Sequence, residues 1–183
     1  RPTRIGSRCM FMACSHAGHN ALVGDGVVLV NSAVLAGWTE VGNGATLSGF
    51  CGVHQFCRVG EGVMFRGRAI ATKHVPPFVV MTEFNQVVGL NRVGIRRNPN
   101  LTASERLDIR LAFRAFYGAE RDRAVRPLRE RLDALDALTL APAAERFRAF
   151  IHECLNAEGR FRRGVAGRRP KRGVSASDED PGE

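Results

Sequence analysis

The chain has 183 residues, of which 44% are hydrophobic and 25% are charged. This composition excludes a generally disordered protein and allows one domain, or one domain with an appendage. The sequence contains neither an apolar run of about 18 residues nor a secretory signal pattern, so we expect a cytoplasmic protein without an integral membrane segment. The net charge of +9 is concentrated in residues 1–100, which hold 10 Lys and Arg against 4 Asp and Glu. An anionic partner or substrate would suit this excess, and a basic surface that only aids solubility would explain it equally well.

A six-residue repeat begins at Ile5 and continues to residue 75. Its first position is apolar in every hexad, at Ile5, Phe11, Ala17, Val23, Leu29, Leu35, Val41, Leu47, Val53, Val59, Phe65 and Ala71. Its fifth position is small or β-branched and never charged, at Cys9, Ser15, Ala21, Val27, Ala33, Thr39, Ala45, Cys51, Cys57, Val63, Ala69 and Val75. Neither a helical nor an ordinary strand period gives this pattern, whereas a coil of three short strands with a corner in each hexad does. We therefore expect both positions to face inward.

A longer period of 18 residues is visible in the pairs Ile5-Gly6, Val23-Gly24, Val41-Gly42 and Val59-Gly60. Three hexads make one coil, so residues 1–77 are predicted to form a left-handed parallel β-helix with four visible coils, each pairing its strands with those of its neighbours. Because the chain begins inside the repeat, we expect further coils before Arg1. Val75-Pro76-Pro77 is predicted to end the repeat, since proline cannot donate a ladder hydrogen bond.

The remaining residues are predicted to form three segments. Residues 78–100 are expected to be an extended stretch that returns over the last coils. Residues 101–157 are expected to form three helices, the first of which begins with a capping box at Thr102 and Glu105. Its apolar face is predicted to contain Leu107, Ile109, Leu111, Phe113 and Phe116. Residues 158–183 have almost no apolar anchor and are expected to be disordered. The predicted fold class is a left-handed parallel β-helix of hexapeptide repeats with a C-terminal α-helical cap domain.

Three histidines fall outside both inward positions of the repeat. They are His16, His19 and His54, and none of them is expected in the core. Coil stacking places His19 in one column with Gly37 and Gln55. We therefore expect a polar group on a limited stretch of the outer surface, with scattered surface polarity as the alternative.

The histidines admit three kinds of chemistry. Zinc binding by all three is conceivable, but the spacing of His16 and His19 crosses a hexad boundary, so their rings are expected to diverge and no metal site is predicted. A cysteine–histidine nucleophile is weakly supported, because Cys14 is close to His16 only in sequence. A neutral histidine fits best as a general base, since imidazole titrates near neutral pH and can remove a proton from a hydroxyl group.

Several motifs, taken together, are similar to those of a known family. They are His16-Ala17-Gly18-His19-Asn20, Asn31-Ser32-Ala33-Val34-Leu35-Ala36-Gly37, Gly52-Val53-His54-Gln55-Phe56-Cys57, Val63-Met64 and Val75-Pro76-Pro77-Phe78-Val79. In this order and register they closely resemble the UDP-N-acetylglucosamine O-acyltransferases, the first enzymes of lipid A synthesis, over roughly residues 3–157. The family's N-terminal coils, which also contribute substrate contacts, have no counterpart in this sequence.

The resemblance implies a cytoplasmic homotrimer with active sites between subunits and no cofactor. The donor would be a β-hydroxyacyl chain on acyl carrier protein, an acidic partner, and the acceptor would be the 3-position of UDP-N-acetylglucosamine. Neither nucleic acid nor a membrane span is implied. The residues that match the family's functional positions are His19 as general base, Gly37 as oxyanion donor through its N–H, His16, His54 and Gln55 at the nucleotide-sugar and acyl sites, Asn91 and Arg97 near the nucleotide or its phosphates, and Met64 and Gly67 where acyl length is gauged.

Three residues depart from the family's pattern. Asn20 stands where the family usually has an aspartate that orients the base, Trp38 replaces a histidine after the oxyanion glycine, and Val93 replaces an acidic residue near the uracil or ribose. These departures motivate an alternative function, a catalytically impaired trimer of the same fold that binds nucleotide sugar or acyl carrier protein without turnover. A zinc-dependent β-helix enzyme of the hydratase type is a third hypothesis.

Overall fold

The computed structural model describes residues 1–118 and 126–168, and its N-terminal part contains twelve strands of two residues each. They are β1 Arg4–Ile5, β2 Met10–Phe11, β3 His16–Ala17, β4 Leu22–Val23, β5 Val28–Leu29, β6 Val34–Leu35, β7 Glu40–Val41, β8 Thr46–Leu47, β9 Gly52–Val53, β10 Arg58–Val59, β11 Met64–Phe65 and β12 Ile70–Ala71. Each strand ends on the first position of a hexad. The six-residue period of the sequence is therefore the period of the strands.

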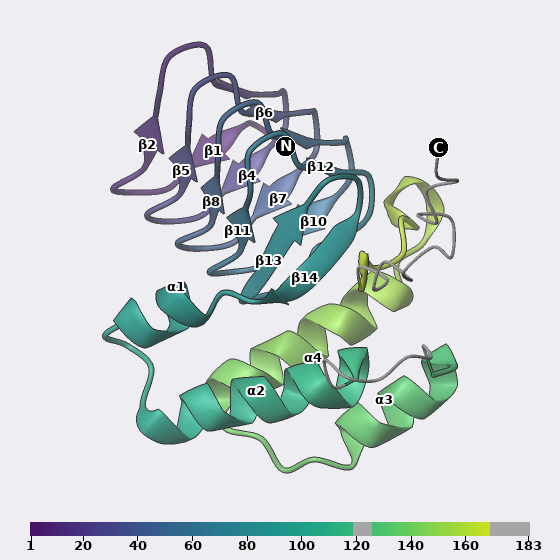
Figure 1. Cartoon of the computed structure of the whole chain (residues 1–183). Coiled ribbons are helices and arrows are strands. Elements are labelled where there is room, and N and C mark those ends of the chain that lie inside the picture. The colour runs from purple at the N-terminus through teal and green to yellow at the C-terminus, as the bar shows by residue number, and fades with distance from the viewer. Residues whose placement is uncertain (119–125, 169–183) are drawn as a thin grey trace, which may run out of the picture.

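The twelve strands form three parallel stacks, one on each side of the coil (Figure 1). Sheet A contains β1, β4, β7 and β10, sheet C contains β3, β6, β9 and β12, and sheet B contains β2, β5, β8 and β11 before it continues into later strands. Partner residues are 18 positions apart, as in Ile5–Val23 and Ala17–Leu35. The fold is a left-handed parallel β-helix with a helical cap, as the repeat predicted.

Inward-facing side chains fill the interior of the β-helix. Leu29 and Leu35 are fully buried, and so are small residues of the fifth position such as Ala33 and Cys57. Burial raises the pKa of the Cys57 thiol to about 11. In the first coil Ile5 is 51% exposed, whereas the inward-facing residues of the second and later coils are buried.

The repeat changes register in its last hexad. The sequence placed Val75 one coil after Cys57, but the structure pairs it with Val59, 16 residues earlier. Val75 still faces inward and is fully buried. The predicted register is wrong here by two residues, because valine suits either inward position and gives no sign of a shortened corner.

The two prolines form a corner and not the end of the β-helix. Pro77 lies against Gly60, where an added Cβ would be 2.6 Å from the Pro77 Cα atom. After this corner, β13 (Val79–Thr82) joins sheet B as a parallel neighbour of β11, and Phe84 bridges to Ile70 of sheet C. A residue at a corner need not donate to the ladder, so proline is tolerated there. The predicted end of the repeat is wrong, and a fifth, partial coil follows.

Residues 78–100 do not return over the coils as predicted. β13 turns into its antiparallel neighbour β14 (Gln86–Leu90), and both strands extend sheet B (Figure 1). A short helix, α1 (Arg92–Arg97), follows. This helix has no clear sequence signal, because its six residues are too few for an apolar stripe and include Gly94.

The cap consists of α2 (Ala103–Tyr117), α3 (Leu128–Asp136) and α4 (Pro142–Leu155). The predicted capping box begins α2: the Glu105 N–H donates to Thr102 Oγ1 at 3.2 Å, and the Thr102 N–H donates to the Glu105 carboxylate at 2.9 Å. No helix in residues 1–118 and 126–168 is long and apolar enough to cross a membrane.

Helix α2 buries only part of its predicted apolar face. Ile109, Phe113 and Phe116 are buried, and the Phe116 ring meets Phe147 of α4 edge to face, with ring centres 6.4 Å apart. Leu107 is 50% exposed. A residue two positions from Ile109 points to nearly the opposite side of a helix, so the predicted burial of Leu107 is wrong, and that of Leu111 fails for the same reason.

The residues after α4 return to the β-helix as a C-terminal strap, defined as residues 159–168. The strap contains a short 3-10 helix, η1 (Gly159–Phe161), and strand β15 (Gly167–Arg168), a parallel neighbour of β14. Ala166 is buried, and its carbonyl accepts a hydrogen bond from the Tyr117 hydroxyl at 2.8 Å. The prediction of disorder is wrong for the strap, because backbone pairing adds to the few apolar contacts that its side chains make. Residues 169–183, also predicted to be disordered, lie outside the described residues.

Candidate active site

The three corners of each coil carry different side chains. The corner between sheets C and A holds His19, Gly37 and Gln55 in one column, and backbone hydrogen bonds join the successive coils there. We call this column, together with the following residues 20, 38 and 56, the histidine corner. Neighbouring coils are about 4.8 Å apart. Groups in adjacent coils of the histidine corner can therefore act on one bound molecule.

His19 lies directly against the backbone of Gly37. A Cβ added to Gly37 would be 2.5 Å from His19 Nε2 and 2.6 Å from its Cε1, so only glycine leaves room for this ring position. The Gly37 N–H donates no hydrogen bond to any of the described residues. The corresponding N–H of Asp25, at the corner between sheets A and B, donates to Asn43 Oδ1 at 2.8 Å. The histidine corner thus places an unused backbone donor beside an imidazole nitrogen.

Asn20 determines which nitrogen of His19 carries the proton. Its Oδ1 lies 2.7 Å from His19 Nδ1, and its Nδ2 donates to the carbonyl of Arg1. This arrangement orients the amide, so Nδ1 is the N–H donor and Nε2, the nitrogen beside Gly37, is the free acceptor. Asn20 has a left-handed backbone with φ of 62°, a conformation that asparagine adopts more readily than most residues.

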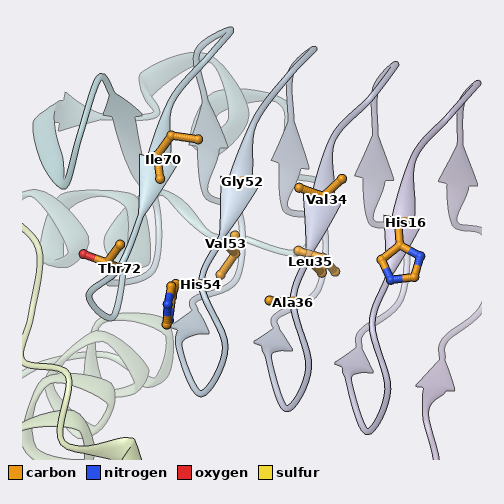
Figure 2. A pocket seen from close by; sticks show the side chains of 9 residues that line it. All are labelled: His16, Val34, Leu35, Ala36, Gly52, Val53, His54, Ile70 and Thr72. Carbon is orange, nitrogen blue, oxygen red and sulfur yellow. The ribbon is translucent and has the colours of Figure 1, made fainter.

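A pocket of about 380 Å³ lies on the outer face of sheet C (Figure 2). It is lined by His16, Val34, Leu35, Ala36, Gly52, Val53, His54, Ile70 and Thr72, mostly through apolar atoms. His16 projects from β3 at one end, and His54 lies toward Thr72 at the other. The structure therefore brings His16 and His54 to one pocket, whereas His19 lies around the adjoining corner.

Gln55 connects the pocket with the histidine corner. It follows His54 in the chain and lies one coil beyond Gly37, with its side chain exposed. His54 Nδ1 is 3.2 Å from the Gln55 carbonyl oxygen. When Nδ1 donates this hydrogen bond, the Nε2 atom of His54 remains as an acceptor for a hydroxyl group.

Met64 and Gly67, which the family resemblance assigns to the acyl chain, lie outside this pocket. Met64 is on β11 in sheet B, and Gly67 is exposed at the corner between sheets B and C. The nearest atom to a Cβ added at Gly67 would be the Gly49 carbonyl oxygen at 3.7 Å, an ordinary contact. A small side chain would therefore fit at this position.

Asn91 and Arg97 lie at the remaining corner, between sheets A and B. Asn91 Nδ2 donates to the Gly62 carbonyl at 2.9 Å, and its Oδ1 accepts from the Gly94 N–H at 2.9 Å, so its amide caps α1. Arg97 is exposed in the last turn of α1 and forms no ion pair with the described residues. The predicted site residues are therefore spread over sheets B and C and all three corners, and one chain does not bring them together.

His74 is a buried histidine that sequence analysis did not assign. Its Nδ1 accepts from the Arg58 N–H at 3.0 Å, and its Nε2–H donates to the Phe161 carbonyl at 2.8 Å. Burial lowers the pKa of His74, and the charges of Arg58 and Arg163 lower it further, although the hydrogen bond to Phe161 acts in the opposite direction. His74 thus joins the corner that follows β12 to the C-terminal strap.

An aromatic row extends the histidine corner toward the strap. Trp38 and Phe56 lie in adjacent coils with ring centres 6.5 Å apart, and Phe161 of the strap meets Phe56 edge to face at 5.4 Å. No sequence signal placed Phe161 here, because it lies in the segment that was expected to be disordered.

Metal-ligating side chains do not converge in the described parts of the chain, where no group of three His, Cys, Asp or Glu residues could hold a metal ion. His16 is on β3, whereas His19 lies beyond the next corner. Cys14 is at the corner between sheets B and C and so precedes β3.

These features define the chain as a hexapeptide-repeat β-helix protein with a histidine at one corner and a helical cap. Residues 74–166 match the family model described as UDP-N-acetylglucosamine O-acyltransferase, domain 2. The matched segment is just over half of the chain and runs from the corner after β12 through β13, β14, α1 and the helical cap into the strap. The chain belongs to the UDP-N-acetylglucosamine O-acyltransferase family.

Relatives with assigned names agree with this membership. The acyl-[acyl-carrier-protein]–UDP-N-acetylglucosamine O-acyltransferase of Gloeothece citriformis is 32% identical over 159 residues, which cover 86% of this chain and 55% of the relative. The protein of the same name from Thiobacillus denitrificans is 40% identical over 116 residues, or 63% of this chain and 45% of the relative. The solved structure of UDP-N-acetylglucosamine O-acyltransferase from Moraxella catarrhalis has a TM-score of 0.70 and 29% identity, covering 90% of this chain and 60% of that one. The chain thus spans about half the length of the curated relatives it matches.

Proposed function

We propose that the chain belongs to an acyltransferase that moves a β-hydroxyacyl chain from acyl carrier protein to the 3-position of UDP-N-acetylglucosamine, the first step of lipid A biosynthesis. The contact between His19 Nε2 and Gly37 carries the proposal, because it sets a proton acceptor beside an unused backbone N–H. The names of the relatives supply the two substrates. The reaction needs no cofactor, and we place it in the cytoplasm.

Acyl transfer would use both groups of the histidine corner. His19 Nε2 accepts the proton of the sugar 3-hydroxyl as its oxygen bonds to the thioester carbon, and the Gly37 N–H stabilises the resulting oxyanion. When the carbon–sulfur bond breaks, the departing thiolate takes the proton from the imidazolium, which restores neutral His19. A general base accelerates such reactions about 10²- to 10⁴-fold, and one oxyanion donor about 10²- to 10³-fold.

The pocket on sheet C is the proposed site for the sugar. A sugar ring has apolar faces and polar edges, so an apolar floor with a few polar groups at its rim suits it. Val34 and Ile70 provide the apolar floor, and His16 and His54 provide the rim. Gln55 would contact the same molecule from the histidine corner.

A homotrimer would complete the site. Within one chain, His19 lies at a different corner from Gly67 and from Arg97. Threefold packing of parallel β-helices turns one corner of each subunit toward a different corner of the next. Arg97 of a second subunit would then reach the nucleotide, with Asn91 holding α1 in place, and Met64 and Gly67 would contact the acyl chain.

The test is incubation of the protein with β-hydroxyacyl carrier protein and UDP-N-acetylglucosamine, with the product followed by mass spectrometry. We expect one acyl group per sugar, formed only when both substrates are present. Sedimentation equilibrium should give three times the mass of one chain. Absence of product from a trimer that binds both substrates would contradict the proposal.

A second candidate is a protein of the same fold that binds nucleotide sugar or acyl carrier protein without turnover. Asn20 favours it, because an amide stabilises an imidazolium less well than a carboxylate does. Trp38 also favours it, since the indole nitrogen cannot accept a hydrogen bond. Val93 is 50% exposed on α1 and offers no charge. Calorimetric binding of UDP-N-acetylglucosamine without any product would support this candidate over the transferase.

A further inference from the structure

Two arginines of the C-terminal strap have no partner of opposite charge among the described residues. The guanidinium carbons of Arg160 and Arg163 lie 5.3 and 5.7 Å from the centre of the Phe56 ring. Neither side chain forms an ion pair or a hydrogen bond with the described residues, and the buried Nε of Arg163 has no acceptor there. Within the described parts of the chain, no carboxylate pairs with these two positive charges beside the Phe56 ring.

A carboxylate in the same region is already paired. The charges of Glu40 and Arg163 both influence the pKa of His74, so Glu40 and Arg163 both lie near this histidine. Glu40 accepts from Arg58 at 3.1 Å and from Arg1 at 2.7 Å. Because these bonds occupy both of its oxygens, Glu40 does not neutralise the arginines of the strap.

The strap holds these arginines at one end of the pocket on sheet C. The pocket reaches His54 and Thr72. Just beyond Thr72, the His74 N–H donates to the Gly164 carbonyl of the strap at 2.8 Å. Phe56, which contacts both guanidinium groups, follows His54 by two residues. A molecule bound in the pocket would therefore extend past His54 toward Arg160 and Arg163.

We propose that Arg160 and Arg163 form a phosphate-binding site at this end of the pocket. The inference rests on the proposed function, in which both substrates carry phosphate: the diphosphate of the nucleotide sugar and the phosphodiester of the carrier's phosphopantetheine. A guanidinium stacked on an aromatic ring keeps the N–H groups along its edge free. Two of these N–H groups can donate parallel hydrogen bonds to two oxygens of one phosphate. Phe56 is thus the platform that orients the two arginines.

Direct binding to the full chain tests the site without requiring turnover. The probes are UDP and 4′-phosphopantetheine, with uridine and pantetheine as the same molecules without phosphate. Trp38, the one tryptophan in the sequence, lies 6.5 Å from Phe56 and provides the fluorescence signal. The variant is Arg160→Gln with Arg163→Gln. Arg162→Gln is the matched control, since Arg162 is an exposed arginine of the same strap that makes no ring contact among the described residues.

We expect the double variant to bind one phosphate probe at least about tenfold more weakly, while Arg162→Gln changes its affinity less than about twofold. Loss of UDP binding assigns the site to the nucleotide sugar, and loss of phosphopantetheine binding assigns it to the carrier. Equal weakening of uridine or pantetheine, or unchanged affinity for both phosphate probes, would overturn the proposal. If melting shows that the double variant is unfolded, the exposed Arg160→Gln change alone is measured against the same criteria. Failed acyl transfer with intact, arginine-dependent phosphate binding would contradict the proposed function and leave this site standing.

Discussion

The Nε2 atom of His19 occupies the space that a side chain at residue 37 would need: a Cβ on Gly37 would lie 2.5 Å from it. The β-helix creates this contact, because coils of 18 residues stack His19 and Gly37 at the same corner. Asn20 completes the arrangement by accepting from His19 Nδ1 at 2.7 Å. The three residues together present an acceptor nitrogen beside a backbone N–H that has no acceptor among the described residues.

Replacing Gly37 with alanine should displace the His19 ring and leave the fold intact, because the clash is with the end of an exposed side chain. We expect kcat for acyl transfer to fall about 10²- to 10⁴-fold, the usual contribution of a general base. Gly89→Ala is the control, since an added Cβ there meets nothing within 4 Å. If Gly37→Ala keeps more than half of the activity, the proposed arrangement is wrong.

Changing Asn20 tests how the imidazole is oriented. Asn20→Asp should preserve transfer and move the acidic limb of the pH–rate profile to higher pH, since a carboxylate favours the imidazolium. Asn20→Ala should lower kcat by at least about tenfold and cost about 1 kcal/mol of stability, because φ is positive there. The readout is the pH dependence of kcat for both variants. Identical profiles for Asn20→Asp and the wild type would exclude this positioning role.

His74 should make stability depend on pH. Its pKa in the folded protein is lowered, mainly by burial, so the unfolded chain binds the proton more readily. We therefore expect the free energy of unfolding to be fully retained above about pH 6.5 and to decrease as the pH falls below it toward the lowered pKa. Urea denaturation at about pH 7.5 and 5.5 measures this decrease in the free energy of unfolding. The decrease should be smaller in the His74→Gln variant than in the wild type. An equal decrease in that variant would rule out His74 as its source.

The two faces of α2 should respond differently to truncation. Ile109 is fully buried and Leu107 is 50% exposed. Ile109→Ala should lower the free energy of unfolding by about 2–5 kcal/mol, whereas Leu107→Ala should change it by no more than about 0.5 kcal/mol. Thermal or urea denaturation of the two variants gives the comparison. Similar losses at both positions would contradict the burial of one face only and would mean that both faces of the helix are packed.

The hexapeptide pattern was sufficient to predict the β-helix, because each inward position is confined to apolar or small residues. It did not predict the shortened corner before Val75, since valine fits both inward columns. The C-terminal strap was missed for another reason: its order comes from backbone hydrogen bonds, such as the Ala166 N–H to the His74 carbonyl at 2.8 Å. Such bonds leave no pattern in the side chains.

The hexad register predicts the parts of the candidate site that depend only on how the coils stack. Stacking alone placed His19 in the column of Gly37, and it kept His16 and His54 on the outer surface. The proposed roles of Arg160 and Arg163 have no sequence signal, because they depend on the strap reaching Phe56. Within one chain Arg97 lies away from the corner that holds His19, and the proposed contact between subunits has no counterpart in the pattern of one chain.

The most direct test of the central claim is the rate of acyl transfer by protein carrying these 183 residues and by its His19→Ala variant. β-Hydroxyacyl carrier protein and UDP-N-acetylglucosamine are the substrates, and His152→Ala in the cap is the control. We expect His19→Ala to lower kcat about 10²- to 10⁴-fold with unchanged melting, and His152→Ala to retain near-normal transfer. Equal transfer by the wild type and His19→Ala would contradict the assignment of His19 as the base.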